Sequence, residues 1–501
     1  MTVLPVELHE SSLWSRTEVP MIDQVVETDV VVVGFGSAGA AAAITAHDKG
    51  ARVVILEKMP AGGGNSRLSA AMLITAKGPG AIQHVEALCF GKTDTGVIEA
   101  YVEGCTKIND WIKALGGETV IYQNPVVTYP TSGFPCWPNV PGWEHTELRR
   151  VAGGTTDELP AMPLWRLLTD NVERRGIKVI TNTLVKELVT NPEGEVVAVN
   201  AEREGKEVSI QAKKAVILAC GSFEYNEEMK ETFLPVTPLY AIGNPGNTGD
   251  GVLMAQKVGA ALWHMNVFHG WFVFKTPEYK AAFTIRFHTP GFIYVDKDGR
   301  RFANETGSEI HEVSKLIMSY VPHRPNYPHS PAYAIFDDLT RRKGPLSGIV
   351  SGANDYKWSL DNSKEITRGW IKQGKTIRDL AKLISVDEAT LTNTVARYNE
   401  SCKLGKEAEF GRSRETLTPI QTPPYCAIEI SPGLGTAAGG PRRDREARVV
   451  NSQKKPIPRL YAAGGLGSIW GFLTLSGGGL TDAIVFGRIA GENAAGENPW
   501  T

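Results

Sequence analysis

The clearest chemical pattern near the start of the chain joins closely spaced glycines to a carboxylate. Residues 34–39 read GFGSAG, which is G-x-G-x-x-G, and Glu57 follows about 20 residues later. Gly34 permits a tight turn, Gly36 lets the backbone approach a pyrophosphate, and Gly39 lets a helix pack closely on a strand. Glu57 can accept a hydrogen bond from a ribose hydroxyl. The pattern therefore predicts a dinucleotide site.

Two buried strands and a helix are predicted around this pattern. Residues 29–33 form an apolar β-branched run, which suits a strand buried on both faces. An alanine-rich helical stretch continues to about residue 47, and residues 52–56 form a second strand. In this βαβ order the helix N-terminus offers free N–H groups and the positive end of its dipole to phosphates. The motif alone does not separate NAD from FAD.

Composition excludes several classes of function. The chain has 501 residues, enough for two or three domains, and a net charge of −2, which gives no sign of a nucleic-acid surface or a basic membrane patch. The six cysteines form no C-x-x-C pair, so neither a zinc nor an iron–sulfur site is predicted. We find no export signal and no apolar run of the roughly 20 residues that span a bilayer. These features predict a cytoplasmic protein without a membrane segment.

Five further motifs follow the glycine pattern in a fixed order. They are a small-residue loop, a buried strand, a T-G-D-G turn, a strand running into glycine, and a glycine loop feeding a helix, at residues 62–71, 215–221, 248–251, 459–465 and 475–491. Together with residues 291–305 and 425–440, they resemble the fumarate reductase and succinate dehydrogenase flavoprotein superfamily. The character of the chain is closest to the 3-ketosteroid dehydrogenase branch. The resemblance covers nearly everything after residue 26.

The resemblance implies an α/β fold in which a Rossmann-like FAD-binding domain carries an inserted α+β capping domain. An N-terminal arm would occupy residues 1–25, and the FAD-binding domain residues 26–265 and 413–501. The cap would occupy residues 266–412, with a helix around residues 385–399. Its first aromatic residues, Trp271, Phe272 and Phe274, are predicted to belong to the core rather than to a substrate pocket.

The family motifs also imply which residues hold FAD. Those predicted for the pyrophosphate, the adenosine, the ribityl chain and the flavin edge are Gly34, Gly36, Ser37, Ala38, Gly39, Glu57, Lys58, Gly64, Asn65, Ser66, Ala70, Ala71, Val185, Ala219, Asp250, Gly465, Gly478 and Leu480. In the complex II flavoproteins a histidine in the loop after the second strand is linked to FAD. Residues 62–71 contain no histidine, so non-covalent FAD is expected.

The positions that handle substrate in the family differ here. Fumarate reductases use a histidine in the stretch that matches residues 433–440, an arginine that matches Thr474, and an arginine acid that matches Glu309. Their proton relay also uses an acidic and a basic residue, and the matching positions here are Ile285 and His288. A dianion needs cationic groups, so fumarate and succinate are poor candidates. The 3-ketosteroid dehydrogenases place tyrosines at Glu309 and Thr474, and neither tyrosine is present.

Five residues remain as catalytic candidates. Glu309 or Tyr129 is a possible base, since Tyr129 resembles the tyrosine of the steroid enzymes' substrate loop. His311 is a possible acid, base or orienting group. Thr474, or backbone N–H groups beginning at Ser476, could stabilise a developing enolate; alternatively, these two residues only shape the flavin pocket.

Three functions stay open at this stage. The first is oxidation or reduction of a C–C bond next to the carbonyl of a cyclic ketone, of steroid size or smaller. The second is the same chemistry on an unsaturated organic acid, with Arg286 or Arg149 as the anion-binding residue. The third is an electron-transfer subunit that docks on an iron–sulfur or membrane partner. The first two require a small-molecule substrate and an external electron acceptor or donor.

Overall fold

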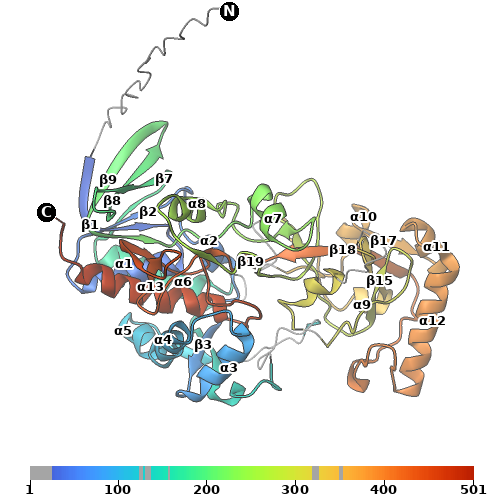
Figure 1. Ribbon diagram of the computed structural model, residues 1–501. Helices are drawn as coiled ribbons and strands as arrows, with labels where there is room; N and C mark the ends of the chain where they lie inside the picture. The colour runs from blue at the N-terminus through green and yellow to red at the C-terminus, as the bar shows by residue number, and fades with distance from the viewer. Residues whose placement is uncertain are drawn as a thin grey trace, which may run out of the picture.

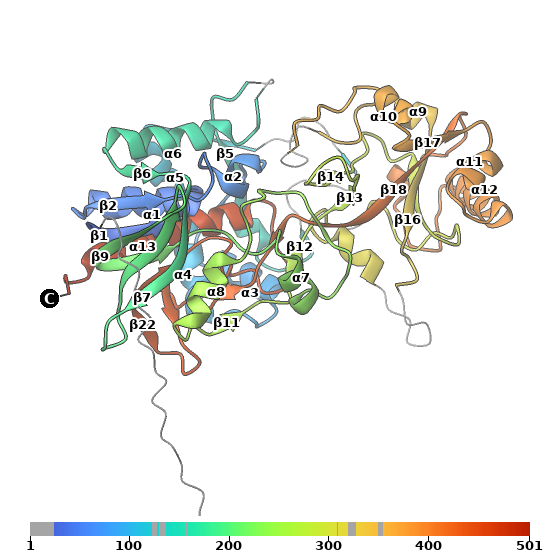
Figure 2. The same ribbon diagram turned by 90° about the horizontal axis from the view of Figure 1, so that it is seen from above.

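The computed structural model describes residues 25–122, 128–129, 137–155, 158–307, 309–318, 327–348 and 354–500. Two lobes lie side by side in both Figure 1 and Figure 2. One contains both chain ends of the described region, and the other contains the helices α9 to α12. In the described part of the chain, no helix is both long enough and apolar enough to cross a bilayer.

The first lobe is built on an eight-stranded sheet. Its strands are β1 (Val25–Val33), β2 (Val53–Leu56), β6 (Lys178–Ile180), β7 (Thr183–Thr190), β8 (Val196–Arg203), β9 (Lys206–Leu218), β21 (Arg448–Val450) and β22 (Pro456–Ala462). The order β21-β22-β9-β1-β2-β6 places β1 in the middle, parallel to β2 and β9, while β7 and β8 form an antiparallel extension. The four strands expected here are therefore present, and β1, β9 and β22 begin earlier than predicted.

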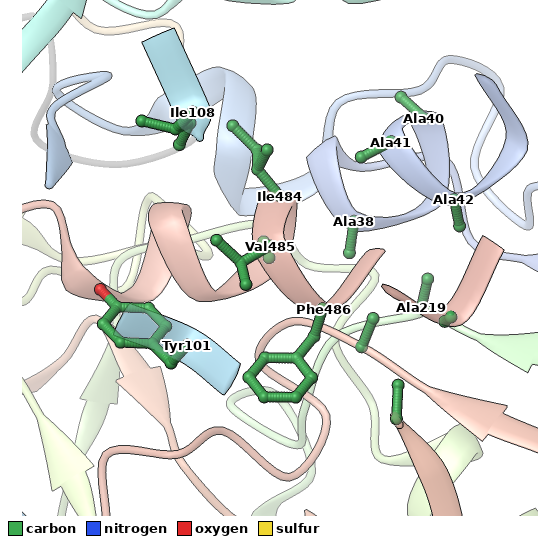
Figure 3. Close-up of a cluster of buried hydrophobic side chains, with 14 of the residues drawn as sticks. Ala38, Ala40, Ala41, Ala42, Tyr101, Ile108, Ala219, Ile484, Val485 and Phe486 are labelled. Carbon is green, nitrogen blue, oxygen red and sulfur yellow. The ribbon is translucent and has the colours of Figure 1, made fainter. Parts of the chain in front are cut away.

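Three helices cover this sheet: α1 (Ser37–Asp48), α6 (Met162–Arg174) and α13 (Gly478–Gly496). Helix α13 lies against α1, and small residues allow the close approach. A Cβ on Gly487 would lie 2.5 Å from the Ala38 carbonyl oxygen, and one on Gly491 would lie 2.3 Å from that of Ala42. Figure 3 shows Ala38 and Ala42 on the side of α1 that faces α13. The alanine-rich sequence of α1 thus follows from its position between sheet and helix.

A smaller layer packs on the other side of α13. It consists of α3 (Gly80–Cys89), α4 (Thr95–Thr106), α5 (Ile108–Ala114), η1 (Trp143–His145), and the strands β3 (Leu73–Ala76), β4 (Thr119–Ile121) and β5 (Thr146–Val151). In the same cluster Ile108 lies beside Ile484 of α13, and Tyr101 lies on the side of Val485 (Figure 3). A Cβ on Gly104 would lie 2.3 Å from the Val485 side chain. Helix α13 is therefore buried between two layers, and its position is fixed on both sides.

The second lobe contains most of the residues predicted to form the cap, and we use that name for it. Its sheet contains β10 (Tyr240–Ala241), β13 (Phe272–Phe274), β14 (Phe283–Thr284), β15 (Phe292–Asp296), β16 (Ala332–Asp337), β17 (Ile371–Gly374) and β18 (Tyr425–Leu434). Its helices are η2 (Val313–Met318), α9 (Asp338–Arg341), α10 (Ser363–Thr367), α11 (Ile377–Leu383), α12 (Glu388–Leu404) and η3 (Arg414–Thr416). Helix α12 is the one expected around residues 385–399. Strand β18 follows the proposed boundary at residue 412 but pairs with β16, so the chain leaves the cap sheet only after residue 434.

A buried ion cluster holds the cap together. Glu305 is fully buried and accepts hydrogen bonds from Arg301 at 2.8 Å and from Arg412 at 3.0 Å. Arg301 also lies 3.4 Å from a carboxylate oxygen of Glu407. Both guanidinium groups are thereby compensated. Glu305 organises the cap and does not line the pocket described below.

Short ladders connect the lobes: β11 (Leu262–Trp263) pairs with β20 (Gly440–Pro441), and β12 (Phe268–His269) pairs with β19 (Thr436–Ala437). Near them lie α2 (Gly64–Leu68), α7 (Glu227–Phe233) and α8 (Asp250–Lys257). In the β12–β19 ladder His269 stands opposite Thr436. This junction brings residues of the second lobe against the first lobe, which contains the segments predicted to bind FAD.

Candidate active site

One long pocket runs from the glycine turn after β1 to the first strands of the cap. All residues predicted to hold FAD line this pocket, except Gly39 and Gly478. A Cβ on Gly39 would lie 2.0 Å from the Gly34 carbonyl oxygen, so Gly39 serves the packing of α1 on the turn. A Cβ on Gly478 would lie 2.5 Å from the Trp470 ring. Each of these two glycines permits a close contact just behind the pocket wall.

The glycine turn has the features that a dinucleotide requires. The Glu57 carboxylate accepts the backbone N–H groups of Phe35 and Met59, both at 2.8 Å, and is therefore held beside the turn. Gly36 caps α1 without a side chain, which leaves helix N–H groups for an anion. A Cβ on Gly36 would meet nothing closer than 3.5 Å, which fits an open space for a phosphate there. These residues fit FAD as the bound group.

Lys58, which was predicted to lie near the adenosine, meets Asp250 in the pocket wall. The Lys58 ammonium lies 2.5 Å from an Asp250 carboxylate oxygen and 2.5 Å from the Thr248 hydroxyl. Val185 is buried and lines the same region. The pair joins the end of β2 to α8, so this part of the pocket wall is formed by contacts between segments far apart in the sequence.

The opposite end of the pocket is formed largely by the cap. Trp271, Thr284, Arg286 and His311 line it, and Tyr122 lines it from the FAD-binding lobe. Trp271 was expected in the core, and this expectation is wrong. Its neighbour Phe272 is core, since adjacent residues of an extended strand point to opposite faces.

His311 and Glu309 form a hydrogen-bonded pair. Glu309 Oε1 lies 2.8 Å from the His311 Nδ1, and Oε2 accepts the His311 backbone N–H at 2.7 Å. The Ser476 hydroxyl donates to Glu309 Oε1 at 3.5 Å. The Glu309 side chain is 2% exposed and does not line the pocket, whereas the His311 side chain is 17% exposed and does. Of this pair, the imidazole meets the pocket and the carboxylate stands behind it.

The remaining predicted catalytic residues have different surroundings. Thr474 is buried and lines the pocket, and its carbonyl oxygen accepts the Trp137 indole N–H at 2.8 Å. Ser476 is buried against Glu309 and does not line the pocket. Tyr129 exchanges two backbone hydrogen bonds with Phe287 and also does not line it. Most of the loop that follows Tyr129, residues 130–136, lies outside the described residues.

Arg286 places a guanidinium in the pocket wall beside the Trp271 ring, with 6.0 Å between the guanidinium carbon and the ring centroid. Its Nε is enclosed and has no hydrogen-bond partner among the described residues. Burial lowers the pKa of Arg286, while Tyr122 and Glu309 act in the opposite direction. The other arginine considered, Arg149, is bound to Glu147 at 2.6 Å and lies away from the pocket.

Two further pocket residues were not predicted. His269 is buried, with its Nδ1 2.8 Å from Glu312 Oε1. Glu224 is buried, and its Oε1 accepts the Ala437 backbone N–H at 3.1 Å. Burial raises the pKa of Glu224. Neither residue belongs to a sequence motif. For His269 the available signal is a polar residue within an otherwise apolar and aromatic stretch, and for Glu224 it is a carboxylate between two aromatic residues.

A family model described as "FAD binding domain" matches residues 29–480. The chain belongs to this family. This flavoprotein is 30% identical over 481 residues to a fumarate reductase (cytochrome) of Shewanella frigidimarina, which covers 93% of the chain and 77% of the relative. It is 29% identical over 486 residues to NADH:fumarate oxidoreductase of Klebsiella pneumoniae, which covers 93% of the chain. The chain spans 47% of the length of that second relative.

The fold is also that of a solved structure. The 3-ketosteroid Δ1-dehydrogenase of Sterolibacterium denitrificans superposes with a TM-score of 0.81 at 22% identity, covering 94% of this chain and 99% of the other. At this identity the likeness shows the fold. The predicted superfamily, the α/β fold and FAD as cofactor are thereby confirmed. The flavoprotein is a FAD-dependent oxidoreductase.

Proposed function

We propose that the flavoprotein interconverts a single and a double C–C bond next to the carbonyl group of a cyclic ketone, of steroid size or smaller. The observation that carries this proposal is the make-up of the cap end of the pocket. Trp271 and Tyr122 supply aromatic walls, and His311 supplies an imidazole backed by a carboxylate. Such walls suit a largely apolar ring, and the imidazole suits transfer of a proton.

Bound FAD supplies a hydride acceptor or donor for the carbon β to the carbonyl. His311 takes the proton from the α carbon. An ionised carboxylate only accepts hydrogen bonds, so the His311 Nδ1 carries the hydrogen that faces Glu309, and Nε2 is left to accept the substrate proton. Glu309 then stabilises the imidazolium that forms. Arg286 and the Thr474 hydroxyl stabilise negative charge that develops on the carbonyl oxygen.

A second candidate substrate is an unsaturated monocarboxylic acid. The observation in its favour is Arg286, whose guanidinium lines the pocket and forms no ion pair with a carboxylate among the described residues. A guanidinium held in a pocket wall without a direct ion pair is costly, and a substrate carboxylate would supply that ion pair. One such cation suits a monoanion better than a dianion.

The two candidates are separated by a turnover screen with a redox dye. Purified FAD-loaded protein is tested with neutral cyclic ketones and enones and with unsaturated monocarboxylates, in both directions. Turnover of the cyclic ketones supports the first proposal, and turnover of the acids alone supports the second. Inactivity toward both sets would contradict both and favour an electron-transfer role on a partner protein.

The variant Arg286→Gln, tested in the same screen, separates the two substrate classes by its effects on KM and kcat. If the substrate is an acid, the KM for it rises at least tenfold; if it is a ketone, kcat falls and KM changes little. Arg149→Gln is the matched control, because that arginine is paired with Glu147 outside the pocket. Equal effects of the two substitutions would mean that Arg286 has no special role toward substrate.

A further inference from the structure

Three titratable side chains connect the outer surface to the inner wall of the pocket. Lys315 donates to Glu312 Oε2, and Glu312 Oε1 lies 2.8 Å from the Nδ1 of His269. Side-chain exposure falls along this series, from 27% for Lys315 to 9% for Glu312 and 3% for His269. His269 then lines the pocket. The series is a continuous chain of charge-assisted contacts with one end at solvent and the other at the FAD site.

The supporting backbone holds this chain in place. The Ser314 hydroxyl donates to the Gly270 carbonyl oxygen at 3.1 Å, which ties η2 to the residue after His269. The Gly270 N–H donates to the His311 carbonyl oxygen at 2.7 Å. The segment that carries Glu312 and Lys315 therefore lies directly against the residues next to His269.

At the inner end of this series, His269 has one ring nitrogen without a hydrogen-bond partner among the described residues. The Nε2 of His269 is enclosed, and no residue in the described ranges offers it a hydrogen bond. Its Nδ1 faces the Glu312 carboxylate. When Nε2 keeps its hydrogen, Nδ1 is the nitrogen that exchanges a second proton with Glu312. Burial alone would raise the pKa of Glu312, but His269 and Lys315 hold it below its ordinary value. A polar atom buried without a partner beside a cofactor site points to an interaction with the cofactor.

We propose that His269 is a redox-linked protonation site of this flavoprotein, and that Glu312 and Lys315 connect it to solvent. Two-electron reduction of a flavin takes up one proton and adds one negative charge to the site. If His269 gains a proton at the same time, that charge is neutralised, and two protons enter for two electrons. On reoxidation both protons leave. The proton from His269 passes from Nδ1 to the Glu312 carboxylate and on to solvent beside Lys315, while Nε2 keeps its hydrogen. This relay is separate from the pair that handles the substrate proton, Glu309 and His311.

Other ionisable groups line the pocket and are alternative sites for the redox-linked proton. Glu224 lies beside Thr436, the residue opposite His269 in the β12–β19 ladder, and its carboxylate accepts the next backbone N–H. Arg286 and His311 line the cap side. Of these groups, Glu224 and His311 can also change protonation with the charge of the site. The test must therefore assign the linked proton to one residue.

The decisive measurement is the midpoint potential of the bound FAD, determined by spectroelectrochemical titration between pH 6 and 9. The pH slope counts protons taken up per two electrons. We expect two protons for the wild-type holoprotein over part of this range, and one proton throughout for His269→Asn, which halves the slope. His288→Asn is the control, since the His288 ring contacts the Pro345 carbonyl oxygen and does not line the pocket. The pH slope of this variant should match that of the wild type.

The kinetic arm tests the route. Reoxidation of the reduced holoprotein by ferricyanide in weak buffer, followed with a pH-indicator dye, should show proton release at least tenfold slower for Glu312→Gln and for Lys315→Met. Lys315 is partly exposed, so its substitution keeps the test available if a buried variant fails to fold. The proposal is overturned if the wild-type slope corresponds to one proton throughout, if Glu224→Gln or His311→Asn halves the slope in place of His269→Asn, or if both route variants release protons at the wild-type rate.

Discussion

Glu309 holds His311 with both of its carboxylate oxygens, one on the backbone N–H at 2.7 Å and one at 2.8 Å from the ring Nδ1. This arrangement fixes the orientation of the ring and determines which nitrogen carries hydrogen. It also favours His311 over Glu309 as the group that exchanges the substrate proton, because only the imidazole of this pair lines the pocket. We therefore expect His311 to exchange the proton and Glu309 to position the imidazole of His311.

The first prediction tests these two roles. His311→Asn should slow flavin reduction by substrate by about 10²-fold or more, the usual scale for a general base. Glu309→Gln should cost less, because the glutamine oxygen can still accept from the ring. FAD content, measured from the absorbance of the purified protein, should stay unchanged in both. A larger loss for Glu309→Gln than for His311→Asn would make Glu309 the base.

A second prediction concerns fumarate. The dye-reduced protein should turn over fumarate at least about 10²-fold more slowly than its best cyclic enone or monocarboxylate, since each lost charge-assisted contact costs about 1.5–3 kcal/mol. At the cap end of the pocket Arg286 is the one Lys or Arg among the described lining residues, and the lining residues Thr474 and Gly435 carry no charge. Steady-state assays with the three substrate types measure this ratio, and comparable rates would contradict the assignment of these positions.

The strands and the glycine turn at the start of the chain could be predicted well because the residue patterns that specify them are close together in the sequence. Val30 to Val33 pair directly with the next strand along the chain, and the glycine turn lies between them. The cap end was harder, because its wall combines residues far apart in the sequence, such as Tyr122, Arg286 and His311. Composition could not separate Trp271 from Phe272, since both are aromatic. Only the direction of each side chain along an extended strand distinguishes the pocket residue from the core residue.

A third prediction concerns the attachment of FAD. Acid precipitation should release all of the flavin into the supernatant as FAD, because residues 62–71 provide no histidine to link it. Fluorescence of the supernatant, before and after phosphodiesterase treatment, distinguishes FAD from FMN. Fluorescence retained by the precipitated chain on a denaturing gel would show a covalent link and contradict the expectation.

A fourth prediction links acidity to the stability of the cap. The Glu407 carboxylate accepts backbone N–H groups of Glu409, Phe410 and Arg412 at 2.7 to 3.3 Å. Burial alone would raise the pKa of Glu407, but these hydrogen bonds and Arg301 bring it below its ordinary value. A lowered pKa in the folded state stabilises the fold above the unfolded value, and this contribution disappears as the pH falls through the folded value.

Glu407→Gln should therefore lower the free energy of unfolding by about 1.5–3 kcal/mol at pH 7, the scale of hydrogen bonds to a charged group. The difference from wild type should shrink as the pH falls below about 4.5, the region in which free glutamate protonates. Urea unfolding at several pH values measures it. Glu400→Gln is the control, because that carboxylate is exposed on α12 and pairs only with Lys403 among the described residues. A difference that does not vary with pH would mean that the charge of Glu407 contributes nothing.

The last prediction concerns the contact between α1 and α13, whose N-terminal ends both face the FAD pocket. Gly491→Ala would bring a Cβ to within 2.3 Å of the Ala42 carbonyl oxygen, so the two helices must separate. Overpacking of this kind costs about 1–3 kcal/mol, and it shifts the glycine turn relative to the residues at the start of α13. Both Tm and FAD content should fall. Gly496→Ala is the matched control at the end of the same helix, where a Cβ would meet nothing within 4 Å. There the higher helix propensity of alanine should leave Tm unchanged or slightly raised. Full FAD occupancy in Gly491→Ala would show that the pocket does not depend on this helix contact.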